Sequence, residues 1–361
     1  MKIEQNKADF TRLLMLWHKK YNKRIMPWKG EKDPYKIWLS EIILQQTRVE
    51  QGMNYYLSFI QKYPTVQKMS AAPDNEVFKL WEGLGYYSRC KNLLAAARFI
   101  ANELKGEFPD SYKTILELKG VGPYTAAAIA SFAYNLPHAV IDGNVNRVLA
   151  RFFCIKTPID SSKGKLQFAA LAQELLHSKK SALYNQAIMD FGATICKPKL
   201  PLCNECLLQK KCTAYHKNWV KELPVKEKRL TKKHRWFYYI LAEYDNKLLV
   251  KKRTGKDIWQ NLHEFLLIET SGQQQPEQIF ASEEFKFFAQ RKYRILQIST
   301  GFKQQLTHQT IHAAFIHIKM DKKTNHINME WIKKGDILKL AFPKLINAYV
   351  QQQAEGKIHS H

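Results

Sequence analysis

Apolar residues recur at close to helical spacing through the first two thirds of the chain. Over residues 34–63 they follow one helical face, and similar patterns continue to about residue 191. The spacing predicts a domain that is mostly α-helical. It fades over residues 217–235, where eight basic and two acidic residues surround Pro224, as is typical of a linker that runs over a charged surface.

The last third of the chain has a different pattern. Residues 236–244 and 247–253 flank an Asp-Asn pair, which predicts a β-hairpin, and residues 309–320 predict another strand. Helices are expected over 276–290 and 336–352. The chain is therefore expected to be multi-domain, with a helical domain (1–216), a basic linker (217–235), a mixed α+β domain (236–352) and a tail (353–361).

Composition narrows the class of protein. A chain of 361 residues with 45% hydrophobic residues is long enough for two folded domains, and no apolar run reaches membrane-spanning length. The formal net charge is +25, an excess that attracts polyanions. We expect a nucleic acid as partner and no membrane association, although a simply solvated basic surface has the same composition.

Four cysteines form a compact C-x6-C-x2-C-x5-C array: Cys196, Cys203, Cys206 and Cys212. Four thiolates at this spacing can converge on one inorganic centre, either an iron-sulfur cluster or tetrahedral zinc, and the spacing alone does not separate the two. Disulfides are the alternative. The N-terminal residues do not have the pattern of a secretory signal, which favours bound metal.

A helix, tight turn and second helix are predicted over residues 111–134. Gly120 can end the first helix with a positive φ, Gly122 lets the backbone approach a ligand, and Pro123 suits the first turn of the next helix. Backbone N–H groups at that helix start can receive a DNA phosphate. An ordinary αα-hairpin has the same turn.

Two carboxyl residues stand in informative surroundings. Glu41 lies inside an apolar helical stretch, where burial disfavours its charged form and raises its pKa, as a general acid requires; a solvated position on the helix surface is the alternative. Asp142 precedes the helix that starts at Gly143 and can cap it. The D-x-N-x-N pattern there is not a calcium loop, because its sixth position is Arg147 and its twelfth is Phe153.

Several ordered motifs resemble those of adenine DNA glycosylases of the MutY family, which belong to the helix-hairpin-helix iron-sulfur glycosylases. The resemblance covers about residues 10–215, and the C-terminal domain resembles that family's Nudix-like recognition domain more weakly. The motifs are residues 39–47 (LSEIILQQT), 83–89 (GLGYYSR), 118–126 (LKGVGPYTA), 140–147 (VIDGNVNR) and the cysteine array.

The resemblance implies an enzyme that removes adenine mispaired with 8-oxoguanine or guanine in duplex DNA. It assigns proton donation to Glu41 and a sugar-facing carboxylate to Asp142, with Asn144 positioning that carboxylate and water. Tyr124 stands where the related endonuclease III has a Schiff-base lysine, which implies a monofunctional enzyme. A bifunctional glycosylase/lyase like endonuclease III and a non-enzymatic iron-sulfur DNA-binding protein are the alternative functions.

The resemblance also assigns residues that contact DNA. Gln46 and Tyr86 match residues that enter the stack, and Thr307 and His308 match the polar part of a Phe-Ser-His element that inspects oxoguanine. Leu306 replaces its aromatic residue. Lys29 stands after Pro27-Trp28, where many relatives have Arg.

The family carries a [4Fe-4S] cluster, so the resemblance favours iron-sulfur over zinc at the four cysteines. The C-terminal domain has no Nudix catalytic box, which argues against nucleotide hydrolysis: Gln278 stands at the expected glutamate position after Gly272. A monomer of the bacterial cytoplasm, associated with the nucleoid, is the expected form.

Overall fold

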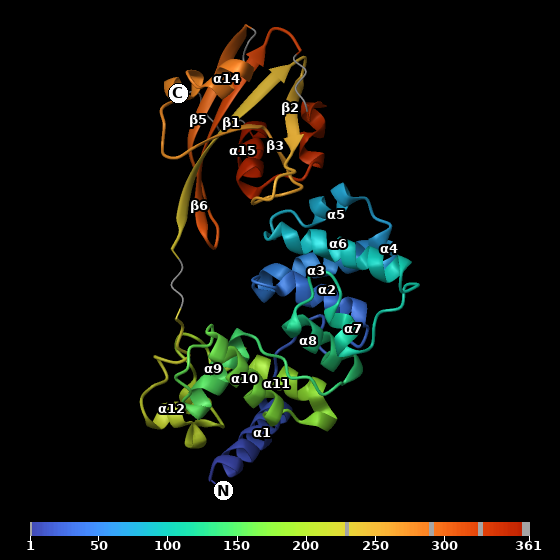
Figure 1. Ribbon diagram of the computed structural model, residues 1–361, viewed down its shortest axis with the longest axis vertical. Helices are drawn as coiled ribbons and strands as arrows, with labels where there is room; N and C mark the ends of the chain where they lie inside the picture. Colours follow the sequence, from blue (N-terminus) through green and yellow to red (C-terminus); the bar gives the residue numbers. More distant parts are fainter. Residues whose placement is uncertain (1, 228–230, 289–291, 324–327, 356–361) are drawn as a thin grey trace. The chain divides into compact units, whose positions relative to one another are not determined.

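The computed structural model describes residues 2–227, 231–288, 292–323 and 328–355 (Figure 1). The chain forms two compact units. Unit 1 comprises Met1–Ala71 and Lys91–Arg229, and unit 2 comprises Ala72–Cys90 and Leu230–His361. The division differs from the domain order predicted from the sequence, because a segment from the helical region belongs to the same unit as the C-terminal domain.

Unit 1 is helical, as the apolar spacing predicts. Its core packs α1, α9, α10 and α11 around aromatic side chains such as Phe10, Phe152 and Phe191. The helices are α1 (Lys2–Tyr21), α2 (Pro34–Leu44), α3 (Val49–Lys62), α4 (Val66–Ser70), the C-terminal part of α6 (Tyr87–Asn102), α7 (Tyr112–Leu116), α8 (Pro123–Tyr134), α9 (Gly143–Phe153), α10 (Ser162–Leu175), α11 (Ser181–Thr194) and α12 (Thr213–His216).

Local signals in the sequence set the start of α2. The Asp33 side chain accepts a hydrogen bond from Tyr35 N at 2.9 Å, and Pro34 occupies the first turn, where its missing N–H costs nothing. The helical region over 34–63 is interrupted at residues 45–48, where Gln46 has a φ of +58°. A left-handed residue cannot continue a right-handed helix, so α3 starts afresh at Val49.

The predicted helix-turn-helix is formed by α7, a tight turn and α8. Gly120 has a φ of +80°, and a Cβ there would stand 2.6 Å from the Cβ of Asn92, so a side chain is excluded both by conformation and by space. Gly122 is the N-cap of α8, and a Cβ added to it meets no atom within 4 Å. The turn therefore leaves the N-terminus of α8 open to a ligand.

The start of the predicted linker is part of unit 1. Trp219, Val220 and Val225 pack against the unit 1 core, where Leu223 is buried. Arg151 Nε donates to Leu223 O at 3.0 Å. At the other end of the predicted linker, strand β1 already begins at Lys233.

Unit 2 contains a mixed sheet that is seven-stranded within the described residues. The parallel pair β1/β6 is central, β5 lies on the far side of β6, and β4 and β2 both pair antiparallel with β1. The strands are β1 (Lys233–Tyr244), β2 (Lys247–Lys252), β3 (His263–Glu264), β4 (Leu266–Thr270), β5 (Tyr293–Gln305), β6 (Gln309–Met320) and β7 (Met329–Lys333). The α+β class expected for this part of the chain is confirmed.

The predicted hairpin and the predicted strand over 309–320 are both present. Asp245 and Asn246 connect β1 to β2 with φ values of +47° and +57°, the backbone that a two-residue hairpin turn requires. Strand β5 was not anticipated. Its residues are mostly half-buried or exposed, so it shows no continuous apolar signal.

The helices predicted in unit 2 are interrupted. Residues 276–290 contain α13 (Pro276–Phe280) and α14 (Glu283–Phe288), with 289–290 outside the described residues. The prediction over 336–352 is wrong in its first half, because α15 (Lys344–Ala354) starts only after Pro343 and a 3-10 helix (Lys334–Lys339) precedes it. A residue before proline is driven out of helical conformation. Helices α13 and α14 cover one sheet face through Ile279 and Phe285.

The segment Ala72–Cys90 brings α5 (Asp74–Leu80) and the start of α6 into unit 2. Lys79 Nζ donates to Leu340 O at 3.0 Å, and Phe342 N donates to Glu82 Oε1 at 2.9 Å. Within the described part of the chain, no helix is long and apolar enough to cross a membrane.

Candidate active site

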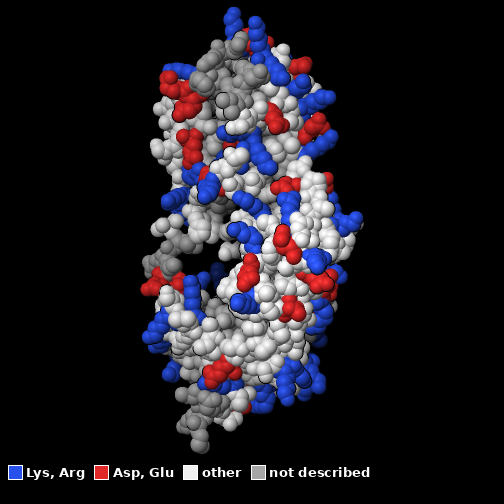
Figure 2. Space-filling model, turned by 45° about the vertical axis from the view of Figure 1, so that its right-hand side comes forward, with Lys and Arg blue, Asp and Glu red and all other residues white. Residues whose placement is uncertain are grey.

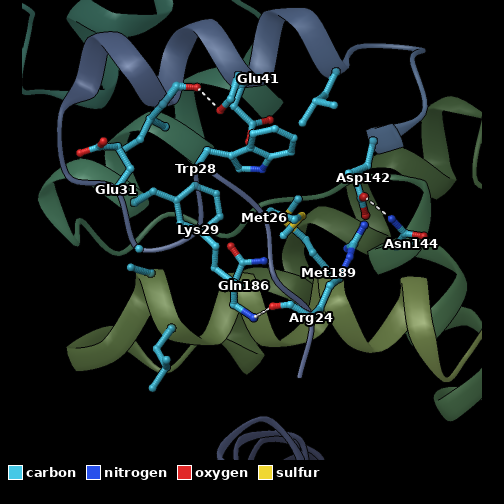
Figure 3. A pocket seen from close by; sticks show the side chains of 18 of the residues that line it. Arg24, Met26, Trp28, Lys29, Glu31, Glu41, Asp142, Asn144, Gln186 and Met189 are labelled. Atoms are coloured by element: carbon cyan, nitrogen blue, oxygen red, sulfur yellow. Dashed lines mark hydrogen bonds between the residues drawn. The ribbon is translucent and has the colours of Figure 1, made fainter. Parts of the chain in front are cut away.

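Unit 1 contains a cavity of about 430 Å³ beside α2 and α11 (Figure 3). Glu41 and Trp28 approach it from one side, Asp142 and Asn144 from a second, and Arg24 and Gln186 from the side of α11. The four residues with predicted catalytic roles, Glu41, Tyr124, Asp142 and Asn144, all line this cavity. The fold thus brings together three motifs that are spread over about a hundred positions of the chain, from Glu41 to Asn144.

Glu41 is buried on α2, as expected, with 6% of its surface exposed. Desolvation by burial raises the pKa of Glu41 to about 7, and the negative charge of Asp142 acts in the same direction. Tyr124 Oη donates a hydrogen bond to Glu41 Oε2 at 2.7 Å, which opposes the shift. Glu41 can therefore hold a proton near neutral pH at the wall of the cavity.

Asp142 caps α9, as the sequence predicts. Its Oδ1 accepts from Val145 N at 2.7 Å, and its Oδ2 accepts from Asn144 Nδ2 at 2.7 Å. Burial raises the pKa of Asp142, whereas these hydrogen bonds lower it, because they stabilise the carboxylate form. The two cavity carboxyl groups thus differ in surroundings: Asp142 accepts two N–H bonds, and Glu41 accepts one phenol.

Arg147 connects Asn144 to the loop that carries the cysteines, a link that sequence reasoning missed. It is 7% exposed. Its Nη2 donates to Asn144 Oδ1 at 2.8 Å and to Gly192 O at 2.6 Å, and its Nε donates to Cys196 O at 2.7 Å. Asn144 in turn donates to Asp142, so a continuous hydrogen-bonded chain runs from the cysteine loop to the cavity carboxylate.

The four cysteines of the array line one small hollow of about 30 Å³, together with Arg151 and apolar side chains. Arg151 Nη1 lies 3.5 Å from Cys196 Sγ, and the same guanidinium donates to Lys197 O at 2.7 Å. All six cysteines lie in the described part of the chain, and all six are free. Among the residues with described positions, no three His, Cys, Asp or Glu are grouped as a single metal ion requires.

The residues predicted to touch the lesion lie in both units. In unit 2, Tyr86 has a φ of +48° and is 41% exposed, and its hydroxyl forms a hydrogen bond with Thr307 Oγ1. His308 is exposed in the same turn, where its carbonyl accepts from Lys233 N at 3.0 Å. Gln46 lies in unit 1 between Leu44 and Thr47, which both line the cavity.

Lysine and arginine side chains are spread over the face drawn in Figure 2, with acidic side chains between them. The excess of positive charge is therefore distributed over that face rather than confined to one spot. A distributed excess attracts a polyanion from many directions, and the local geometry decides where it binds.

Family models match both parts of the chain. The model described as "HhH-GPD superfamily base excision DNA repair protein" matches residues 39–174, and that of the NUDIX domain matches residues 237–352. A solved structure of a thermostable thymine-DNA glycosylase aligns with a TM-score of 0.56 and 30% identity, over 60% of this chain and all of the other. Fold and site together define a DNA glycosylase of the helix-hairpin-helix class, an enzyme of base excision repair.

Curated relatives refine this assignment. An adenine DNA glycosylase of Buchnera aphidicola subsp. Schizaphis graminum is 31% identical over 348 residues, which cover 95% of this chain and 98% of that protein. The adenine DNA glycosylase of Rattus norvegicus is 41% identical over 217 residues, 58% of this chain and 42% of that protein. The chain belongs to the adenine DNA glycosylase family, which confirms the resemblance found in its motifs.

Proposed function

We propose that the protein hydrolyses the N-glycosidic bond of adenine paired with 8-oxoguanine or guanine in double-stranded DNA. Membership of the family supports adenine as the base released. The observation that carries the mechanism is the pair of carboxyl groups at one cavity, Glu41 with its pKa raised to about 7 and Asp142 held by two N–H donors.

The chemistry follows from the different surroundings of these two groups. An adenine flipped out of the duplex enters the cavity, and protonated Glu41 donates its proton to a ring nitrogen of the base. The bond between sugar and base then breaks, and its electron pair leaves with adenine. Asp142, as a carboxylate, stabilises the positive charge that develops on the sugar, and water adds to the anomeric carbon and loses a proton. The products are free adenine and an abasic site.

A monofunctional reaction is proposed because the amines around the cavity are engaged elsewhere. Tyr124 occupies the lysine position of the lyases and binds Glu41. Of the cavity lysines, Lys29 Nζ lies 3.0 Å from Asp190 Oδ2, and Lys32 Nζ donates to Phe132 O at 2.9 Å. A Schiff base needs an amine that is free to attack the sugar, and both of these amines are held by other partners.

Recognition of the base opposite adenine is assigned to unit 2. Tyr86 offers an aromatic face for stacking, with the Arg89 guanidinium 5.5 Å from its ring centre. The hydroxyl groups of Tyr86 and Thr307 share a hydrogen bond, and the exposed His308 is the next residue after Thr307. Hydroxyl and imidazole groups supply donors and acceptors that can distinguish oxoguanine from guanine.

The four cysteines are proposed to hold a [4Fe-4S] cluster. Their thiols line one hollow yet are not grouped around a single-ion position, and a cluster of several metal atoms needs its ligands farther apart than one zinc ion does. When bound, the cluster supplies a rigid brace for the loop between α11 and α12. Lys197 and Lys210 in that loop are available for DNA phosphates.

The test is single-turnover release of adenine with excess enzyme, on duplexes that pair adenine with 8-oxoguanine or guanine, with strand breaks measured before and after alkali. Prompt release with breaks only after alkali is expected. Breaks before alkali, or borohydride trapping of a covalent complex, would instead indicate a lyase. Tight binding without release would indicate a binding protein. Anaerobically purified protein should carry about four irons per chain, and stoichiometric zinc without iron would overturn the cluster.

A further inference from the structure

The α1–α2 connector, residues 22–33, forms much of the cavity wall without being a helix or strand. It contributes seven of the 22 lining residues: Arg24, Met26, Trp28, Lys29, Gly30, Glu31 and Lys32. Its C-terminal half is fixed by Lys32, which donates to Phe132 O at 2.9 Å, and by Trp28, whose ring packs edge-on against Tyr56 with centres 5.3 Å apart. An irregular segment has no backbone ladder to define its position, so side chains must do so.

One carboxylate fixes the N-terminal half of the connector. Asp190 on α11 is fully buried. It accepts from Asn22 Nδ2 at 2.8 Å and from Arg24 Nη1 at 2.9 Å, and Lys29 Nζ lies 3.0 Å from its Oδ2. Lys29 Nζ also donates to Arg24 O at 2.8 Å, a hydrogen bond between two residues of the connector. The donors are all more than 160 positions away from Asp190 in the sequence.

Asp190 also shares a helix with residues that face the cavity. Gln186 and Met189 on α11 line it directly, and both lie within four positions of Asp190 (Figure 3). The anchor of the connector and the opposite wall of the cavity are therefore parts of one rigid helix. A displacement of the connector changes the width of the space between them.

We propose that Asp190 is a positioning residue for base selection. It holds Arg24 and Lys29 at the cavity wall so that the extruded base is seated against α11 and its exocyclic edge is read. Removing the charge leaves two partly buried cations without their counter-ion, and each then moves toward solvent. The inference rests on the proposed function only in that this cavity receives the base.

Two variants test the inference, and two others are controls. Asp190→Asn keeps the shape and removes the charge. Asn22→Ala removes one hydrogen bond to Asp190. Asn22 Nδ2 also lies 2.9 Å from Nδ1 of His18, which lines the cavity, so His18→Ala is measured beside it to separate that contact from the effect on the connector. The second control is Asp9→Asn: Asp9 is buried, lies 3.0 Å from Arg12 and 3.2 Å from Lys211, and lines no part of the cavity that the structure describes.

The measurement is the single-turnover release rate of adenine and of purine, which lacks the 6-amino group, opposite 8-oxoguanine. Affinity is measured on a duplex with a non-hydrolysable 2′-fluoro adenosine. Asp190→Asn should lower adenine release roughly tenfold to a hundredfold, as a misplaced substrate does, and lower the adenine-to-purine ratio. Asn22→Ala should also lower the adenine release rate and the adenine-to-purine ratio, but by less. Asp9→Asn should lower the melting temperature and leave the ratio unchanged.

The outcomes separate the two proposals. If Asp190→Asn and Asn22→Ala lower the melting temperature like Asp9→Asn but keep the adenine-to-purine ratio, Asp190 has only a structural role and the inference is overturned. If Asp190→Asn does not fold, the comparison of Asn22→Ala with His18→Ala decides: an adenine-to-purine ratio that falls no further in Asn22→Ala than in His18→Ala overturns the inference. If the wild-type protein itself releases no adenine, it is the proposed function that fails.

Discussion

Glu41 and Asp190 are both buried carboxyl groups beside the same cavity, but their partners differ. Glu41 lies on the buried, mostly apolar helix α2, accepts a hydrogen bond from one phenol and feels the negative charge of Asp142. Asp190 has two cations and an amide within 3.0 Å. Burial therefore does not by itself decide what a carboxyl group does, because the groups that contact it differ between the two positions.

The two carboxyl groups therefore have different roles at the cavity. Glu41 takes part in the reaction, and Asp190 positions one wall. Glu41, with a pKa near 7, can give up and regain a proton at ordinary pH, as acid catalysis requires. Asp190 forms ion pairs with Arg24 and Lys29 and so holds the irregular connector in place. Substituting each carboxyl group in turn separates the two roles.

The largest expected effect comes from substituting Glu41. Glu41→Gln keeps the shape and loses the proton donor, so single-turnover adenine release should fall by about 10²–10⁴-fold. Duplex affinity should change little, since the substitution leaves the cavity wall in place. Glu50→Gln, on the exposed surface of α3, is the matched control and should keep the wild-type rate. A wild-type rate for Glu41→Gln would remove its role as the acid.

The same change from acid to amide should have opposite effects on stability at the two positions. Asp190→Asn leaves two partly buried cations without their buried counter-ion and should cost about 3 kcal/mol in the free energy of unfolding. The pKa of Glu41 rises on folding from 4.5 to about 7. The contribution of protonated Glu41 to the free energy of unfolding is therefore complete below about pH 4.5 and is lost as the pH rises through 7. At pH 8, Glu41→Gln should therefore be more stable than wild type, by on the order of 3 kcal/mol.

Denaturant unfolding of Glu41→Gln, Asp190→Asn and wild type at pH 5 and pH 8 measures these differences in the free energy of unfolding. The gain of Glu41→Gln over wild type should be small at pH 5 and largest at pH 8, whereas the loss for Asp190→Asn should be present at both. A loss of stability for Glu41→Gln at pH 8 would show that Glu41 is not desolvated in solution.

Asp142→Asn should lower adenine release by roughly 10²–10³-fold, because an amide does not stabilise the positive charge on the sugar. Asparagine is also a good N-cap, so the melting temperature should change little. The control is Ser111→Asn. Ser111 is the N-cap of α7 and lies away from the cavity, so this substitution should leave the rate of adenine release unchanged. A large drop in melting temperature for Asp142→Asn would mean that the rate reports on folding.

The smallest expected effect is a shift in pH dependence. The rate of adenine release should fall as the pH rises through about 7, because Glu41 loses its proton. Tyr124 lowers the pKa of Glu41 through its hydrogen bond, so Tyr124→Phe should move this fall to higher pH. Single-turnover rates between pH 5 and 9 measure the shift. A fall that moves to lower pH would contradict the assigned direction of that hydrogen bond.

Local sequence signals predicted much of the fold. Asp142 before Gly143 marked the start of α9, and the Asp245-Asn246 pair marked the hairpin with its left-handed turn. These features depend on residues next to one another, so a short window contains them. Strand β5 has no such signal because much of it faces solvent. The prediction of a helix over 336–352 did not take into account that Pro343 disfavours helical conformation in the residue before it.

The sequence by itself determined the helical class of unit 1, the two cavity carboxyl groups and the cysteine array, since each belongs to a motif of adjacent residues. Only the tertiary structure decided that Asp190 meets Asn22, Arg24 and Lys29, that Arg147 joins Asn144 to the cysteine loop, and that Ala72–Cys90 belongs to unit 2. Such contacts join residues far apart along the chain, and packing rather than local preference selects them.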